Sequence, residues 1–412
     1  MKALNISFSE NKEKVLFFLD ISVVFLLSVN FLFADLNYSV SWIALVLLFP
    51  FVGLRLVIDR DVYLPEKTIF VLIGIFIAVQ ILSSIFSAST RESLFVVRRR
   101  AMLYLPFFTS IMFIKNLAQL KKILSALIVF TALISLYEIA RFFADPYFSS
   151  TPISELRIGY FGHPVTLGEI KMLVLILIAV LIFSKVNFLF SKKWLLVLSV
   201  PIVTSLFLTN SRGAWLGLIV ALIVLGLLRN KKLVYVITAG LVLFLILAPG
   251  PLKERMQSIT EWNNKGVQSR IAMWYISTFM IHDYPVLGVG SGDPINIYNH
   301  YRGTLRYQGE GHHMHNNIIH LLVTTGMLGF AAWLALMVFI FDKQIKVYRQ
   351  TKNKPTLNDL ALISVLSMLA FQVSGLTDWN FGDFAFSFVN WVFISFAFLA
   401  EKFNSGNEPV KT

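Results

Sequence analysis

The sequence contains no cysteine and has few charged residues. The lack of cysteine excludes thiolate catalysis, disulfide bonds, iron–sulfur ligation and cysteine-based zinc sites. Charged residues make up only 14% of the 412 residues and hydrophobic residues 57%, whereas soluble domains carry about 25% charge. We therefore expect an integral membrane protein with no separate soluble domain.

Long apolar runs recur along the chain, each close to the ~20 residues that a helix needs to cross a bilayer. They predict an all-α polytopic protein of about 12 transmembrane helices. The expected spans are residues 15–34, 38–58, 68–88, 101–114, 122–143, 164–184, 193–209, 213–228, 232–248, 316–341, 358–376 and 382–400. The first nine fill residues 1–248, an outer loop domain fills 249–315, and the last three spans and a cytoplasmic tail fill 316–412. No internal repeat is evident, which argues against a transporter built from duplicated halves.

The net charge of +13 does not indicate nucleic-acid binding, because the cations lie in short loops between the spans. Placing both termini in the cytoplasm puts 18 Lys and 4 Arg inside, against 2 Lys and 11 Arg outside. Guanidinium grips phosphate bidentately, whereas ammonium is a hydrated point charge. The outer face is thus expected to bind a phosphorylated or otherwise anionic ligand; nonspecific binding of membrane lipid headgroups is the alternative.

Part of the outer loop has the pattern of an amphipathic helix lying on the bilayer. Its apolar face would consist of Ile271, Trp274, Tyr275, Thr278 and Phe279, with Arg270 at the level of the phosphates. Packing against the helix bundle is compatible with the same pattern.

A histidine-rich run, residues 309–329, passes directly from polar loop into apolar helix. It holds His312, His313, His315 and His320, and a histidine at a helix mouth can act as a base near neutral pH. A hydrogen-bonded capping segment is the alternative. With Glu310 these side chains could ligate zinc or manganese, but neighbouring loop histidines point in different directions and no HExxH pattern occurs, so we expect no metal site.

Other catalytic classes have less support. Ser211 and Ser291 lack a GxSxG context, so a covalent serine intermediate is not expected. Paired carboxylates of the glycosidase type could be drawn from Asp293, Glu310, Asp378 and Asp383, but the sequence does not show that any two face a sugar. Glu169 and Lys171 lie within one span and are interpreted as a structural ion pair.

A base together with several arginines suits transfer of a group away from a diphosphate. The arginines would neutralise the departing phosphate while the base takes the proton of an acceptor hydroxyl. Since no ATP is present outside the cytoplasm, the donor would be a lipid-linked diphosphate sugar.

The residues around this base resemble a known signature. His315-Asn316, nine residues, and then Gly326-Met-Leu-Gly329 match H[NSQ]-x9-G-x-x-G of the bacterial O-antigen ligase family, whose wider group includes O-antigen polymerases. Two further blocks are similar to the family: residues 209–215 (TNSRGAW), and Arg270 with Trp274 followed by residues 285–292 (PVLGVGSG). The similarity covers roughly residues 155–330.

The resemblance implies a C-type glycosyltransferase fold in the inner membrane. The donor would be an undecaprenyl-diphosphate-linked glycan, the acceptor a sugar hydroxyl of lipid A core, and no metal or other cofactor would be needed. An O-antigen polymerase, or a polysaccharide flippase or exporter without chemistry, is the alternative.

The resemblance also assigns roles to individual residues. It makes His315 the base, Arg212 and Arg270 the diphosphate clamps, and Arg157 a further, less regular element. Asn316 would orient His315 or cap the following helix. Three more residues complete the expected substrate-binding set: His312, His313 and Arg98.

Overall fold

The computed structural model describes residues 2–34, 37–145, 157–235, 238–239, 265–292, 294–303 and 311–406. These residues form helices and no strand, which confirms the predicted all-α class. The helices are α1 (Lys2–Phe33), α2 (Tyr38–Ile58), α3 (Lys67–Ile85), α4 (Thr90–Met102), α5 (Leu105–Phe113), α6 (Leu117–Ala144), α8 (Pro164–Ile182), α9 (Lys192–Leu208), α10 (Arg212–Arg229), α13 (Lys265–Asp283), α14 (Ile295–Arg302), α15 (Asn317–Gln350), α16 (Pro355–Ser374), the short η1 (Asn380–Gly382) and α17 (Phe384–Asn404).

Within the described residues, nine helices are long and apolar enough to cross a membrane: α1, α2, α3, α6, α8, α10, α15, α16 and α17. Each corresponds to one of the expected spans. Of the other three expected spans, residues 193–209 form α9, with 17 residues, and residues 101–114 contain α5, with nine. Residues 232–248 lie largely outside the described residues.

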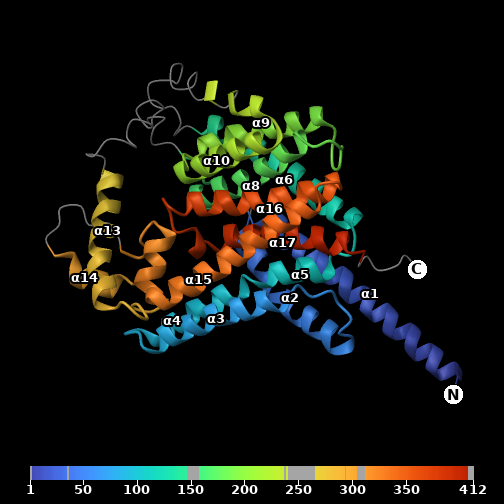
Figure 1. The fold of residues 1–412 in the computed structure, drawn as a ribbon, viewed down its shortest axis with the longest axis horizontal. Helices are drawn as coiled ribbons and strands as arrows, with labels where there is room; N and C mark the ends of the chain where they lie inside the picture. Colours follow the sequence, from blue (N-terminus) through green and yellow to red (C-terminus); the bar gives the residue numbers. More distant parts are fainter. Residues whose placement is uncertain are drawn as a thin grey trace.

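The helices form layers around α15, α16 and α17 (Figure 1). Helices α8 and α10 pack against α16 on one side, whereas α3 packs against α15 on the other. Helix α17 is the most enclosed of the nine candidate spans, because 94% of the residues in its apolar 18-residue stretch are buried. Helices α13 and α14 lie at one end of the bundle, and the start of α1 and the end of α17 lie at the other. We call the former the α13 end and the latter the terminal end.

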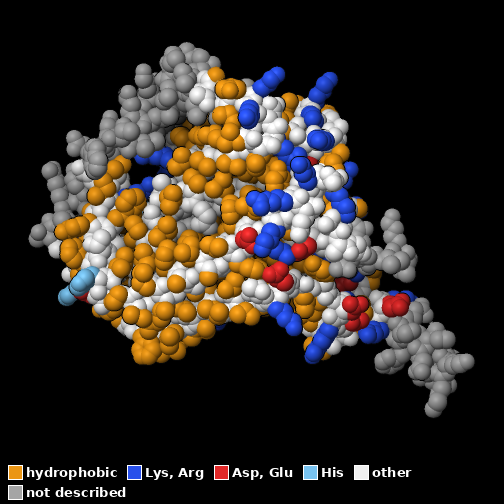
Figure 2. Space-filling model, viewed as in Figure 1, with side chains coloured by type: hydrophobic (Ala, Val, Ile, Leu, Met, Phe, Trp, Pro, Cys, Tyr) orange, Lys and Arg blue, Asp and Glu red, His pale blue; other side chains and the backbone are white. Residues whose placement is uncertain are grey.

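The surface agrees with a bilayer environment. Figure 2 shows hydrophobic side chains spread over the helices between the two ends, whereas lysine, arginine and acidic side chains gather towards the terminal end. Large apolar side chains are widely exposed: Phe17 and Phe25 on α1 and Val200 on α9 are each 63% exposed or more. Soluble monomers seldom expose apolar surface on this scale, so the pattern supports a multi-pass membrane protein.

Helix α15 is broken at Gly326, which has φ +63° and ψ −166° inside an otherwise helical segment. The loop that follows α13 docks into the break. Four backbone hydrogen bonds join the two segments: Val289 N–H to Val323 O (2.9 Å), Gly290 N–H to Thr324 O (3.0 Å), Met327 N–H to Pro285 O (2.8 Å) and Leu328 N–H to Val286 O (3.2 Å). The first glycine of the GxxG signature is therefore the position where the glycine-rich loop is fixed onto α15.

Helix α13 exposes the expected face, with one exception. Ile271, Tyr275 and Phe279 are 39–56% exposed, while Met273, Ile276 and Met280 on the other face are buried. The prediction for Trp274 was wrong: its indole N–H turns inward and donates to the carbonyl of Met314 at 2.8 Å. Trp274 is half-buried, so its indole N–H needs such an acceptor, and the carbonyl that supplies it belongs to the histidine run.

The expected ion pair between Glu169 and Lys171 does not form. Lys171 instead pairs with Glu138 of α6 at 3.1 Å, with both side chains fully buried. Glu169 accepts a hydrogen bond from Ser374 at 2.5 Å and a longer one from Asn380 at 3.4 Å. Residues two apart on a helix face different directions, so each of the two finds its partner on a neighbouring helix.

Candidate functional site

His315 lies immediately before α15 in a left-handed conformation, with φ +45°. This backbone region is uncommon for a residue other than glycine and is often found at functional sites. The next residue, Asn316, is the N-cap: its side chain accepts hydrogen bonds from the N–H groups of Ile318 (2.9 Å) and Ile319 (3.1 Å). Of the two expected roles for Asn316, the capping role is the one that its contacts fulfil.

The histidine ring is held by a carboxylate from the segment between α16 and α17. His315 Nδ1 lies 3.2 Å from Asp378 Oδ1, which also accepts the backbone N–H of Trp379 at 2.8 Å. Burial by itself would raise the pKa of Asp378. The hydrogen bond and charge of His315, the N–H of Trp379 and the charge of Arg270 outweigh burial and lower the pKa to about 2. A carboxylate that remains ionised can accept an Nδ1–H of His315 and leave Nε2 available as a base.

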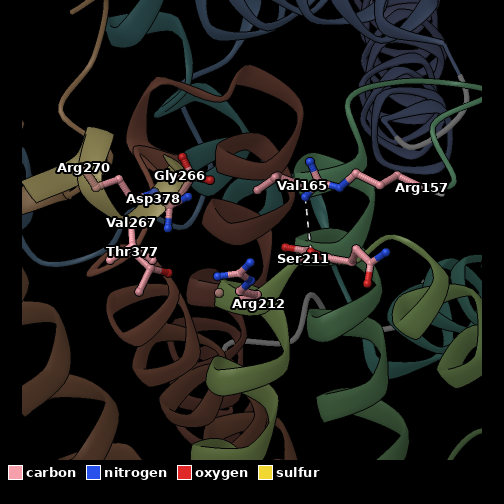
Figure 3. A pocket seen from close by; sticks show the side chains of 11 residues that line it. Arg157, Val165, Ser211, Arg212, Gly266, Val267, Arg270, Thr377 and Asp378 are labelled. Atoms are coloured by element: carbon pink, nitrogen blue, oxygen red, sulfur yellow. Dashed lines mark hydrogen bonds between the residues drawn. The ribbon is translucent and has the colours of Figure 1, made fainter. Parts of the chain in front are cut away.

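Two adjoining cavities open beside this pair, with volumes of about 270 and 630 Å³. Arg157, Arg270 and Asp378 line both cavities, Arg212 lines the smaller one, and His313 and His315 line the larger one. Figure 3 shows Arg270 next to Asp378, with Arg212 and Arg157 extending towards the same space from α10 and from the segment before α8. The structure thus brings together four candidate residues from four separate parts of the chain: Arg157, Arg212, Arg270 and His315.

The segment around Arg212 has features that suit an anion. Arg212 is the first residue of α10, where backbone N–H groups and the helix dipole favour negative charge. The side-chain hydroxyl of Ser211 also lines the cavity, is buried, and has no hydrogen-bond partner among the described residues. Across the cavity, Arg157 donates to the carbonyl of Asn210 at 3.2 Å.

Three possible metal ligands meet at the base. The donor atoms of His313, His315 and Asp378 all lie within 4.8 Å of one another, and nitrogen and carboxylate donors suit Zn²⁺ or Mn²⁺. This differs from the expectation that the loop histidines point apart, because the left-handed turn at His315 brings the two rings to 4.1 Å. Arg270, whose charge acts on Asp378, opposes a cation here. Metal independence stays a prediction.

The larger cavity has further titratable side chains in its lining. Glu169 and Asp383 line it together with His163. Burial raises the pKa of Asp383, although a hydrogen bond from Thr166 opposes this. Asp378 and Asp383, two of the four carboxylates considered for a glycosidase-type pair, therefore share one cavity. The other two, Asp293 and Glu310, lie outside the described residues.

Two of the expected substrate contacts lie away from these cavities. His312 is exposed and lines neither of them, and Arg98 is exposed on α4, where it lines a separate depression. A different arginine of α4, Arg100, lies nearest to the site: its guanidinium carbon is 5.1 Å from the ring centroid of Trp379.

Sequence reasoning did not assign Asp378 to the base and did not foresee the inward turn of Trp274. From the sequence, Asp378 is only one of several acidic residues outside the apolar spans, any of which could be the partner of His315. No local pattern links it to His315, which lies 63 positions away.

Comparison with known proteins agrees with the motifs. The family model described as O-Antigen ligase matches residues 195–334, which include most of α9, all of α10, α13 and α14, and the first half of α15. No curated protein matches the chain. The match confirms the family that the sequence motifs indicated, a family of glycosyltransferase-like enzymes that covers both ligases and polymerases. The matched region, residues 195–334, is thus similar to the O-antigen ligase family.

Proposed function

We propose that the protein is an O-antigen ligase that transfers a glycan from undecaprenyl diphosphate to a sugar hydroxyl of lipid A core. The observation that carries the proposal is the His315–Asp378 pair beside cavities lined by Arg157, Arg212 and Arg270. A base and a diphosphate clamp are the two parts that this reaction needs from a protein.

In the proposed reaction, His315 Nε2 takes the proton of the acceptor hydroxyl. The acceptor oxygen then bonds to the anomeric carbon of the donor sugar, and the bond from that carbon to the diphosphate oxygen breaks. The electron pair of the broken bond stays on the diphosphate, where arginine donors neutralise it. Asp378 stabilises the imidazolium that forms. Attack opposite the leaving group inverts the anomeric carbon.

We further propose that the α13 end faces the periplasm and that both termini lie in the cytoplasm of an inner-membrane protein with a C-type glycosyltransferase fold. Cytoplasmic loops of membrane proteins are enriched in lysine and arginine, and these side chains gather towards the terminal end (Figure 2). The exposed apolar face of α13 would then lie in the outer leaflet near the site.

An O-antigen polymerase would use the same base and clamp but a second lipid-linked glycan as acceptor. The deciding experiment supplies purified protein in liposomes with lipid-linked glycan, with or without lipid A core. A ligase joins glycan to the core, whereas a polymerase lengthens glycan on its own carrier when the core is absent. Movement of unchanged donor across the bilayer, without a new glycosidic bond, would support a flippase and contradict both.

The His315→Ala variant tests the base. It should insert into the membrane normally and lose transfer by about 10²-fold or more. His282→Ala is the matched control, because the side chain of His282 on α13 is 86% exposed and contacts Asp283, away from the cavities. Transfer at the normal rate by His315→Ala would refute the assignment. Unchanged transfer after treatment with a chelator is expected as well, and loss of transfer that Zn²⁺ or Mn²⁺ restores would instead assign His313, His315 and Asp378 to a metal.

A further inference from the structure

Helix α4 carries arginines that the cavities beside His315 do not use. Arg91 and Arg98 are exposed, and with Leu94 and Phe95 they line an open depression of about 960 Å³. Leu94 is 37% and Phe95 50% exposed, and the guanidinium of Arg98 lies 4.9 Å from the Phe95 ring centroid. A short helix with apolar side chains beside arginines suits the boundary between acyl chains and headgroups.

The arginines on this surface are available for a ligand. Among the described residues, neither Arg91 nor Arg98 forms an ion pair, and Glu92 is the one acidic residue that lines the depression. Guanidinium binds phosphate through two parallel N–H···O bonds. The chemistry of the surface therefore fits a lipid that carries phosphate.

The inner end of α4 reaches the candidate site. Arg100 packs over Trp379, the residue that follows Asp378, and its Nε and Nη1 are buried without a hydrogen-bond partner among the described residues. The outer end is anchored as well, because Gly292 N–H donates to the Ser93 hydroxyl at 3.0 Å. Since Gly292 ends the loop that docks onto α15, helix α4 is fixed relative to the base.

The two groups of arginines lie on opposite sides of the central helices. Arg212 begins α10, which packs on α16, whereas α4 packs on α3, and α3 packs on α15 (Figure 1). Transfer between two membrane lipids needs both of them to reach one base. A second phosphate-binding surface, separated from the first by the central helices, meets this need without the two lipids competing.

We propose that Arg91 and Arg98 of α4 bind phosphate groups of the acceptor lipid and thereby direct its sugar towards His315. This inference rests on the proposed transfer reaction and names the chemistry of its acceptor: a membrane glycolipid with phosphate on or next to its sugars. Leu94 and Phe95 contact the acyl chains of that lipid.

The test compares the double variant Arg91→Gln/Arg98→Gln with the unaltered protein in liposomes of neutral phospholipid. The acceptor is lipid A core, used intact or after enzymatic removal of its phosphates. We expect the variant to raise the KM for the intact acceptor by about 10-fold or more, because it loses charged hydrogen bonds to phosphate. The KM for the donor should not change. With the dephosphorylated acceptor, the two proteins should behave alike.

Arg302→Gln is the control for removing positive charge at the same end of the molecule, because Arg302 lies on α14 and contacts Asn299. An equal effect of the double variant on both acceptors would overturn the proposal. So would an effect that follows the content of anionic phospholipid, since α4 would then be a general lipid anchor.

Acceptor binding measured without donor separates this inference from the proposed reaction. Weaker binding of intact lipid A core by the double variant supports the α4 surface even if no transfer occurs, in which case only the proposed reaction fails. Equal binding by the variant and the unaltered protein, alongside normal transfer, contradicts the α4 surface alone.

Discussion

His315 Nδ1 lies 3.2 Å from Asp378 Oδ1, a contact between residues 63 positions apart. The Asp378 carboxylate is anchored by the backbone N–H of Trp379, and the His315 backbone is held in a left-handed turn next to the Asn316 cap. Each of the two side chains is thus positioned by contacts within its own segment as well as by the other. A base that is oriented in this way presents one nitrogen to a substrate and keeps the other on the carboxylate.

Replacing Asp378 with Asn should slow transfer by about 10²-fold or more while changing the KM for the donor little. The amide can hold the ring in the wrong tautomer and cannot stabilise the imidazolium. Steady-state kinetics with lipid-linked glycan and lipid A core check this. Glu13→Gln, an amide replacement of an exposed acidic residue on α1, controls for removing one negative charge. A loss confined to the donor KM would indicate that Asp378 acts in binding and not on the base.

The same carboxylate makes stability depend on pH. The pKa of Asp378 lies below its ordinary 3.8, at about 2. Ionised Asp378 therefore stabilises the folded protein by about 2 kcal/mol above pH ~4, and this contribution is lost as the pH falls from ~4 to ~2. Thermal unfolding in detergent should show a steeper fall in Tm over that window for the unaltered protein than for Asp378→Asn. Parallel curves would contradict the lowered pKa.

The sequence predicted much of the site because its signals are local. His315 with Asn316, Arg212 and Arg270 lie in short motifs. Each apolar run of about 20 residues predicts a transmembrane helix without reference to the rest of the chain. Asp378 and Trp274 were missed in their actual roles because each depends on the distance between segments far apart in the chain. The break at Gly326 has a local signal, its glycine, but the loop that fills the break lies about 40 residues upstream in the sequence.

Arginine geometry, and not charge alone, should decide activity in the clamp. Arg212→Lys and Arg270→Lys keep the charge but lose the planar fork, so kcat/KM should fall about 10- to 100-fold for each. Arg302→Lys on α14 serves as the control and should behave like the unaltered protein. Transfer at near-normal rates by both clamp variants would favour lipid anchoring over diphosphate binding.

The break in α15 should not tolerate a side chain at Gly326. A Cβ there would lie 2.3 Å from the carbonyl oxygen of Val286, and φ +63° is strained for any residue with a Cβ. The docked loop follows α13, which carries Arg270, and is hydrogen-bonded to α15, which begins just after His315. Displacing the loop therefore moves the clamp relative to the base. Gly326→Ala should lower both Tm and transfer, with a destabilisation of about 2 kcal/mol or more.

Gly53 in α2 provides the matched control, because a Cβ at that position meets no atom within 4 Å. Gly53→Ala in a helix interior should leave transfer unchanged and keep or slightly raise Tm, since alanine favours the helix by about 1 kcal/mol over glycine. If Gly326→Ala behaved like Gly53→Ala, the loop would not be needed at the break. The joint occurrence of the glycine-rich block and the GxxG block in this chain would then need an explanation other than their docking, such as contact of both with substrate.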